Sequence, residues 1–242
     1  MTWSGDRPAS LVADRWVVVT AVKSLDAAKT RLALAAPQRR DLACAMALDT
    51  IAAAAGCRAV AAVLVVTAND HVARLVARLG ASAGPTADAS VHVLADEPGG
   101  GLNAVFSYGL GVAATAYPDH AAAAMPADLP CLDSDGMGLA LGLSGAHASA
   151  VVPDANGTGT VLLTQPTHNL VRPRFGTRSF AAHVAAGARP IIDPRLRPMR
   201  HDIDTLRDLH RAAPWITGPR TLACLDRLSV NRPRIALERE PA

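Results

Sequence analysis

Short apolar runs alternate with longer amphipathic stretches along the first half of the chain. The runs are WVVVTAV (16–22), AVLVVTAND (62–70), VHVLAD (91–96) and AAAAMPADLP (121–130). Runs that are apolar on both faces are typical of strands buried inside a parallel sheet. Stretches with helical spacing follow them, at 38–55, at 70–79, up to residue 116 and from residue 134 onward. This alternation predicts an α/β sandwich with a largely parallel sheet.

The second half of the chain has a different rhythm. Two β runs, ASAVVPD (148–154) and GTVLLTQ (159–165), flank the turn-rich segment ANGTG. They predict a hairpin, and therefore an antiparallel element in a mixed sheet. The segment RHDID (200–204) is expected to return as the last strand. Helices are expected at 179–187, 206–212 and 221–228.

Composition is that of a globular protein, with 50% hydrophobic and 19% charged residues. The net charge of +3 and the lack of a Lys/Arg block with interleaved aromatics argue against a nucleic-acid partner. Residues 1–15 read as a flexible leader without the apolar core of a signal peptide, and 16–22 is too short to span a membrane. We expect a cytoplasmic protein with one domain over 16–230 and a tail over 231–242.

Cysteine spacing indicates neither a zinc site nor a redox motif. The four cysteines form no CxxC pair. Free thiols in a reducing compartment are the expected state, in agreement with a cytoplasmic location. The cysteines are Cys44, Cys57, Cys131 and Cys224.

Basic residues follow the first strand. Lys23, Lys29 and Arg31 lie in a loop or a first helical turn. Because backbone N–H groups and the helix dipole add to their charge, this segment can hold phosphates. The alternative is an ordinary solvated basic face. Neither a Walker loop nor a GxGxxG fingerprint is present.

Glycines and an amide follow the third strand. Gly99–Gly101 allow the backbone to approach a flat ligand, and Asn103 can donate to and accept from a base or a ribose. The alternative is a flexible turn with an asparagine near the start of a helix.

Carboxylates follow the fourth strand and the expected last strand. Asp202 and Asp204 would point to the same face of a strand, where like charges repel unless a cation lies between them. The alternative is that Asp204 or Thr205 caps the next helix. If Asp128 joins the pair, three carboxylates converge, and such oxygen ligands favour Mg²⁺. Carboxylate-bound Mg²⁺ beside cations that hold phosphates is the layout of phosphoryl and nucleotidyl transfer.

Five segments together resemble the CofC/FbiD guanylyltransferases of deazaflavin coenzyme biosynthesis. They are, in order, AVKSLDAAKTRL, ADLP, GTGTVLL, RFGTRS and HDIDTLRDL, between Val17 and Leu209. The resemblance implies one nucleotidyltransferase domain with a Rossmann-like three-layer sandwich, similar to nucleotide-diphospho-sugar transferases. It also implies that GTP and phosphoenolpyruvate are joined to give enolpyruvoyl-2-diphospho-5'-guanosine and pyrophosphate. Archaeal members of the family use 2-phospho-L-lactate instead.

The resemblance also implies roles for individual residues. Asp128, Asp202 and Asp204 would bind the metal, and Thr160, Gly176 and Ser179 would contact the phosphoacid. Catalysis would rest on Lys23, Lys29 and Asp128, and nucleotide binding on Lys23, Lys29, Arg31 and Asn103. The chain reads ADLP where family members often read GDLP. The roles of His168, Arg172 and Arg174 stay open.

Several alternatives remain at this point. The same chemistry on 2-phospho-L-lactate or 3-phosphoglycerate is one, and a related nucleotidyltransferase acting on a sugar phosphate is another. A nucleotide-binding regulatory protein without turnover is a third, although it would not need three clustered carboxylates. The expected partners are GTP and a small phosphorylated three-carbon acid, with a homodimer as a possible assembly.

Overall fold

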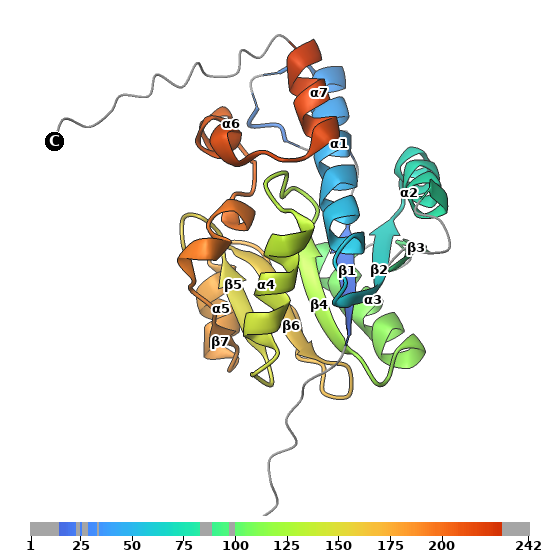
Figure 1. Cartoon of the computed structure of the whole chain (residues 1–242), viewed down its shortest axis with the longest axis vertical. Helices are drawn as coiled ribbons and strands as arrows, with labels where there is room; N and C mark the ends of the chain where they lie inside the picture. The colour runs from blue at the N-terminus through green and yellow to red at the C-terminus, as the bar shows by residue number, and fades with distance from the viewer. Residues whose placement is uncertain are drawn as a thin grey trace, which may run out of the picture.

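The sheet has seven strands in the order β3-β2-β1-β4-β6-β5-β7 (Figure 1). The computed structural model describes residues 15–22, 25, 29–32, 34–82, 89–96 and 100–228. β1 to β4 pair in parallel, β6 runs antiparallel to β4 and β5, and β7 is parallel to β5. The expected mixed and mostly parallel sheet, with a β5–β6 hairpin, is confirmed. The strands are β1 Trp16–Ala21, β2 Val60–Thr67, β3 Ser90–Ala95, β4 Ala121–Pro126, β5 Ala150–Pro153, β6 Thr160–Pro166 and β7 Arg189–Pro190.

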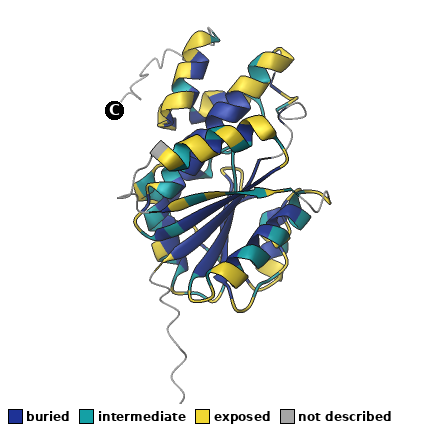
Figure 2. Ribbon diagram, turned by 90° about the vertical axis from the view of Figure 1, so that its right-hand side faces the viewer, coloured by how far each residue is buried: buried dark blue, intermediate teal, exposed yellow. Residues whose placement is uncertain are grey.

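Helices cover both faces of this sheet, so the fold is a three-layer sandwich (Figures 1 and 2). α1, α2 and α4 pack on one face, and α3 and α5 pack on the other. Short 3₁₀ turns occupy Pro194–Leu196, Pro198–Arg200 and Ala213–Trp215. The helices are α1 Ala36–Ala55, α2 Asp70–Ser82, α3 Leu102–Ala116, α4 Ser134–Ser144, α5 Ser179–Ala185, α6 Leu206–Ala212 and α7 Pro219–Arg227.

Alternate residues of the central strands enter two separate cores. Val18 packs with α1, α2 and α4, whereas Val17 and Val19 pack with α3. Because both faces are buried, the strands are continuous apolar runs, and Figure 2 draws them dark blue between helices whose outer faces are yellow. Gly109 lets α3 lie against β1, because a Cβ there would come within 2.5 Å of Val19.

A third apolar cluster lies beyond the sheet, where α1 meets α6 and α7. Asp49 of α1 is buried and accepts hydrogen bonds from the backbone N–H groups of Arg220 and Thr221, at 3.2 and 2.7 Å, at the start of α7. Ile203 is fully buried in the same cluster. The buried side chain of Ile203 therefore fixes the position of its sequence neighbours Asp202 and Asp204.

The prediction of a last strand over RHDID (200–204) is wrong. Residues 201–203 have no regular structure and are followed by a bend, and the last strand is instead the short β7. Two proline-led 3₁₀ turns precede the segment, and Ile203 is its one fully buried side chain. A single buried residue in five does not make the alternating face that a strand needs to pair.

Most other boundaries agree with the sequence within a few residues, and α6 was predicted over its full length. The leader, apart from Arg15, and the tail over 231–242 lie outside the described residues. No helix among the described residues has both the length and the apolar character that a membrane crossing requires.

Candidate active site

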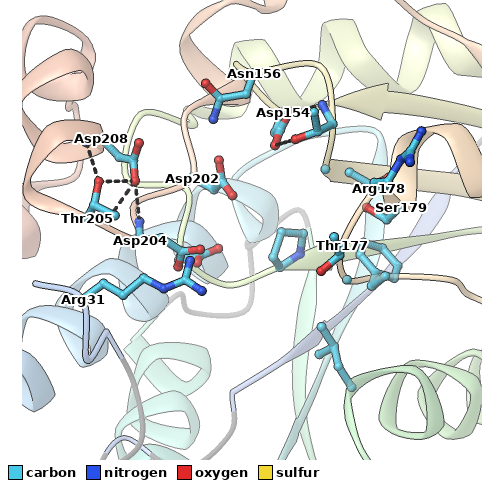
Figure 3. A pocket seen from close by; sticks show the side chains of 18 of the residues that line it. Arg31, Asp154, Asn156, Thr177, Arg178, Ser179, Asp202, Asp204, Thr205 and Asp208 are labelled. Atoms are coloured by element: carbon cyan, nitrogen blue, oxygen red, sulfur yellow. Dashed lines mark hydrogen bonds between the residues drawn. The ribbon is translucent and has the colours of Figure 1, made fainter.

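Two cavities meet at the carboxyl ends of the central strands. The polar cavity, of ≈ 810 Å³, is lined by the hairpin, by the segment before α5 and by the segment around Asp202 (Figure 3). The apolar cavity, of ≈ 740 Å³, is lined by the ends of β1 to β4 and by α1. Both include Asp128 and Asp204 in their walls. The strand order reverses direction between β1 and β4, which is where open α/β sheets bind ligands.

Lys29 joins two carboxylates at the boundary between the cavities. Its ammonium group forms ion pairs with Asp128 and with Asp204, the second at 2.9 Å. Burial alone would lower the pKa of Lys29, but the nearby carboxylates of Asp128 and Asp204 raise it above its ordinary value. The lysine is therefore charged at neutral pH. The cation that we expected beside these aspartates is, in this structure, a side chain of the same protein.

The backbone of Lys29 is unusual. Its φ is 56°, in the left-handed region that residues other than glycine seldom adopt. The turn at 29–31 therefore places the ammonium group at the carboxylates at some cost in conformational energy.

Asp202 lies close to three other carboxylates. Its pKa is raised to about 7, first by burial and then by the charges of Asp128, Asp154 and Asp204. Asp154, at the end of the hairpin's first strand, was not predicted as a site residue. Its side chain accepts a hydrogen bond from the backbone N–H of Thr158 at 2.8 Å. Its position at the end of a predicted strand was a signal available in the sequence. Several aspartates share such a position, so this signal did not single out Asp154.

The carboxylates partly fit a metal ion. Asp128 Oδ1 is buried and has no hydrogen-bond partner in the described structure, which is what a cation ligand would leave when the cation is absent. However, no three His, Cys, Asp or Glu side chains within the described ranges converge closely enough to hold a metal as they stand. Lys29 separates Asp128 from Asp204, so the donor set has the right chemistry but is not preassembled.

Thr160 and His183 form a buried pair in the wall of the polar cavity. Thr160 Oγ1 lies 3.0 Å from His183 Nδ1, and the backbone N–H of Arg174 donates to His183 Nε2 at 2.9 Å. Burial and the charge of Arg174 lower the pKa of His183 to about 4, so the ring is neutral at pH 7. Because Nε2 accepts, the ring proton lies on Nδ1 and is donated to Thr160. The hydroxyl proton of Thr160 is left to donate elsewhere.

Gly176 and Ser179 line the same cavity as Thr160. Gly176 has φ 125°, which requires a glycine at this turn. Ser179 is buried at the first position of α5. The structure thus brings Thr160 of β6 next to the turn before α5 and the first residue of that helix. Four arginines, Arg31, Arg178, Arg207 and Arg211, also line the cavity and make it suitable for an anion.

The residues predicted for nucleotide binding are dispersed. Lys23 lies outside the described residues, and Arg31 lines the polar cavity rather than the apolar one. Asn103 donates to Phe175 O at 3.0 Å and accepts from Phe175 N at 2.7 Å. Its amide therefore holds the loop before Gly176, and a direct contact of Asn103 with a nucleotide stays a prediction.

Thr205 caps α6, as the alternative interpretation of this segment expected. Its hydroxyl accepts from the backbone N–H of Asp208 at 3.2 Å, and Asp208 accepts from the backbone N–H of Thr205 at 2.8 Å. This reciprocal capping box leaves the carboxylate of Asp204 to Lys29. His168 and Arg172 line neither of the two cavities.

The fold has known counterparts. A protein of Desulfovibrio desulfuricans described as a nucleotide-diphospho-sugar transferase superposes with a TM-score of 0.63 at 16% identity, over 89% of this chain and 95% of its own. A cytidylyltransferase of Leptospira borgpetersenii superposes with a TM-score of 0.51 at 12% identity, over 90% and 95%. The fold is that of the nucleotide-diphospho-sugar transferases.

Sequence comparison gives the family. Residues 16–192 match the family described as "Guanylyl transferase CofC like". A phosphoenolpyruvate guanylyltransferase of Streptomyces coelicolor is 41% identical over 89% of this chain and 98% of its own length. One from Thermomonospora curvata is 41% identical over 90% and 92%. The chain belongs to the CofC-like guanylyl transferases, and the resemblance seen in its sequence motifs is confirmed.

Proposed function

We propose that this protein joins GTP to phosphoenolpyruvate and releases pyrophosphate, with the help of Mg²⁺. This proposal rests on one observation: a polar and an apolar cavity meet at the group formed by Asp128, Lys29 and Asp204. A transfer between two substrates needs two pockets that open onto one reacting centre. The relatives named phosphoenolpyruvate guanylyltransferase support the choice of acid.

The polar cavity suits the phosphoacid. Phosphoenolpyruvate carries a phosphate and a carboxylate, and the cavity offers the hydroxyl of Thr160, the side chain of Ser179 and several arginines. Hydrogen bonds from such groups to an anion are about twice as strong as those between neutral groups. The apolar cavity, walled by alanines, Val22 and Leu25, suits a flat base and a ribose.

In the proposed reaction, a phosphate oxygen of phosphoenolpyruvate attacks the α-phosphorus of GTP. A new P–O bond forms, the bond from the α-phosphorus to the bridging oxygen breaks, and the β- and γ-phosphates leave as pyrophosphate. No proton has to be removed from an ionised phosphate, so the protein's task is to position two anions and neutralise their repulsion. Lys29 and Lys23 would supply positive charge on the nucleotide side.

Asp128, Asp202 and Asp204 are the residues that would hold Mg²⁺. When bound, the ion would neutralise phosphate charge and polarise the α-phosphoryl group. Oxygen donors alone, as in this set, suit Mg²⁺ better than zinc. Cytoplasmic location and a homodimer remain predictions, and the second can be tested by light scattering on the purified chain.

Pyrophosphate release tests the proposal directly. Purified protein with Mg²⁺ and GTP should release pyrophosphate when phosphoenolpyruvate is added, and much less with 2-phospho-L-lactate, 3-phosphoglycerate or a sugar 1-phosphate. Chelation of the metal should stop release, and re-addition of Mg²⁺ should restore it. A preference for another acid would correct the substrate. Nucleotide binding without release for any acid would favour a regulatory protein.

A further inference from the structure

Among the described residues that line the apolar cavity, Asp96 is the one carboxylate that does not belong to the Asp128–Lys29–Asp204 group. It follows β3 directly and lies in a wall that is otherwise mostly apolar. Its Oδ1 atom is buried, and no group in the described part of the chain hydrogen-bonds to it. A buried carboxylate oxygen without a partner costs free energy unless a ligand supplies the missing donors.

The position of Asp96 relative to the reacting centre follows from the sheet. Each strand end contributes one segment to the floor of the cavity: Ala21 at the end of β1, Ala68 after β2, Asp96 after β3 and Asp128 after β4. Asp96 and Asp128 are therefore separated by the three spacings between β3, β2, β1 and β4, roughly 14 Å in total. This separation is similar to the distance that a nucleotide spans from its phosphates to the far edge of its base.

Hydrogen-bond donors are what such a carboxylate requires, and the bases differ in the donors they present. Guanine carries two adjacent donors on its Watson–Crick edge, N1–H and the 2-amino group, which match the two oxygens of a carboxylate. Adenine presents the lone pair of N1 at the same place, which a carboxylate repels. Hypoxanthine keeps N1–H but lacks the amino group, and xanthine replaces that group with a carbonyl oxygen.

We propose that Asp96 selects guanine in the apolar cavity by accepting hydrogen bonds from N1–H and the 2-amino group. This inference rests on the proposed function, because it assumes that the apolar cavity holds the nucleotide. It assigns base selection to the end of β3, away from the phosphates and from the acid. The small alanines along the floor leave room for the base to lie flat between the two ends.

Exchange of the carboxylate for an amide gives the sharpest test. Asp96→Asn removes one acceptor from guanine and adds a donor that matches the 2-carbonyl of xanthine. We expect kcat/KM for GTP to fall roughly ten- to a hundredfold and kcat/KM for XTP to rise above the wild-type value. Misfolding cannot produce a gain of XTP use. Wild-type protein should also use ITP about tenfold or more less well than GTP, a measurement that needs no variant.

A matched control is available at the neighbouring strand. Asp70→Asn makes the same change at the exposed start of α2, outside both cavities, and should leave all nucleotide preferences unchanged. If Asp96→Asn lowers GTP, ITP, ATP and XTP use by one common factor, Asp96 contacts the ribose or the fold, and the proposal is overturned. The proposal is also overturned if Asp96→Asn changes neither the kcat/KM values nor their ratios between the nucleotides.

Binding measurements separate this inference from the proposed function. The affinities of wild type and Asp96→Asn for GTP, ATP and XTP can be measured by calorimetry without any acid. If GTP is bound selectively and the selectivity moves with Asp96, the inference holds even when no pyrophosphate is released. If pyrophosphate is released but base preference ignores Asp96, the proposed function stands and the inference is overturned.

Discussion

The two cavities differ in how their walls are built. The polar cavity is made of side chains already engaged with one another, such as Thr160 with His183 and Asp154 with Thr158. The apolar cavity is made of strand ends and small side chains, and among the described residues it contains two carboxylate oxygens without a partner, Oδ1 of Asp128 at the junction and Oδ1 of Asp96 at the far end. The first wall is preorganised for a small, highly charged molecule, whereas the second offers room and one point of recognition.

This difference matches what each of the two proposed ligands can supply. A small anion has little surface, so its binding depends on accurately placed donors that do not have to reorganise. A nucleotide has a large flat base, so burial against an apolar wall contributes much of its binding and a few polar contacts give selectivity. Asp128 and Asp204 line both cavities, so changes at these two residues should affect both substrates.

The largest effect is expected at this junction. Asp128→Asn, Asp202→Asn and Asp204→Asn should each lower kcat by about a thousandfold, because each removes charge that positions the metal or Lys29. Steady-state rates of pyrophosphate release with each substrate varied in turn will measure this. Asp193→Asn, at a partly buried carboxylate paired with Arg195 outside both cavities, is the control. Near-normal rates with Mg²⁺ in all three variants would remove the metal-site assignment.

Lys29→Met should have the next largest effect. It removes both ion pairs at the junction while keeping an apolar stem of similar length, and kcat/KM for GTP should fall about a hundredfold. Because Lys29 lines only the apolar cavity, the KM for the acid should change much less. Arg58→Ala, an exposed change at the opposite ends of the strands, is the control. An increase confined to the acid KM would mean that Lys29 acts on the acid and not on the nucleotide, which contradicts this prediction.

The parts of the fold that could be predicted are those that local pattern determines. Four parallel strands, three of them buried, and the helices between them follow from apolar runs and helical spacing, because both faces of the sheet are covered. The segment around Asp202 could not be predicted in this way. One buried residue, Ile203, attaches it to a cluster formed by α1, α6 and α7, and no sequence period reports such an attachment.

The candidate site divides in the same way. Asp128, Asp202 and Asp204 were predicted because strand ends meet at one edge of a sheet, although the segment at 202–204 is not a strand. Thr160, Gly176 and Ser179 were predicted only through the family resemblance. Asp154 and His183 were missed because their roles depend on contacts between distant segments. Asn103 was noticed for its amide, but the structure shows that the amide bonds to the backbone of Phe175.

The preorganised wall itself is tested by two hydroxyl deletions. Thr160→Val and Ser179→Ala should raise the KM for phosphoenolpyruvate by roughly ten- to a hundredfold, the value of a lost hydrogen bond to an anion of about 1.5–3 kcal/mol. The KM for GTP should stay within twofold. Thr164→Val, a buried threonine of the same strand whose hydroxyl bonds to Ala150 O, is the matched control. Reduced thermal stability with an unchanged acid KM would make both hydroxyls structural.

The smallest effect is one of stability, and it concerns the residue that orients Thr160. The pKa of His183 is about 4 in the folded protein and near 6.5 in an unfolded chain, so below pH 6.5 the unfolded state binds a proton that the folded state does not. Stability contributed by the neutral ring is therefore complete above pH 6.5 and is lost as the pH falls toward 4. Between pH 7.5 and pH 5 the loss should be about 2 kcal/mol.

His183→Asn isolates this contribution, because asparagine can still donate to Thr160 but does not titrate in this range. Urea unfolding of both proteins at pH 7.5 and pH 5 gives four free energies of unfolding. The advantage of the wild type over the variant should shrink by about 2 kcal/mol at the lower pH. A constant difference would mean that His183 is protonated equally in both states. In that case the folded ring would be protonated at pH 5 and its Nε2 could not accept from Arg174 at that pH, so the lowered pKa of His183 would be wrong.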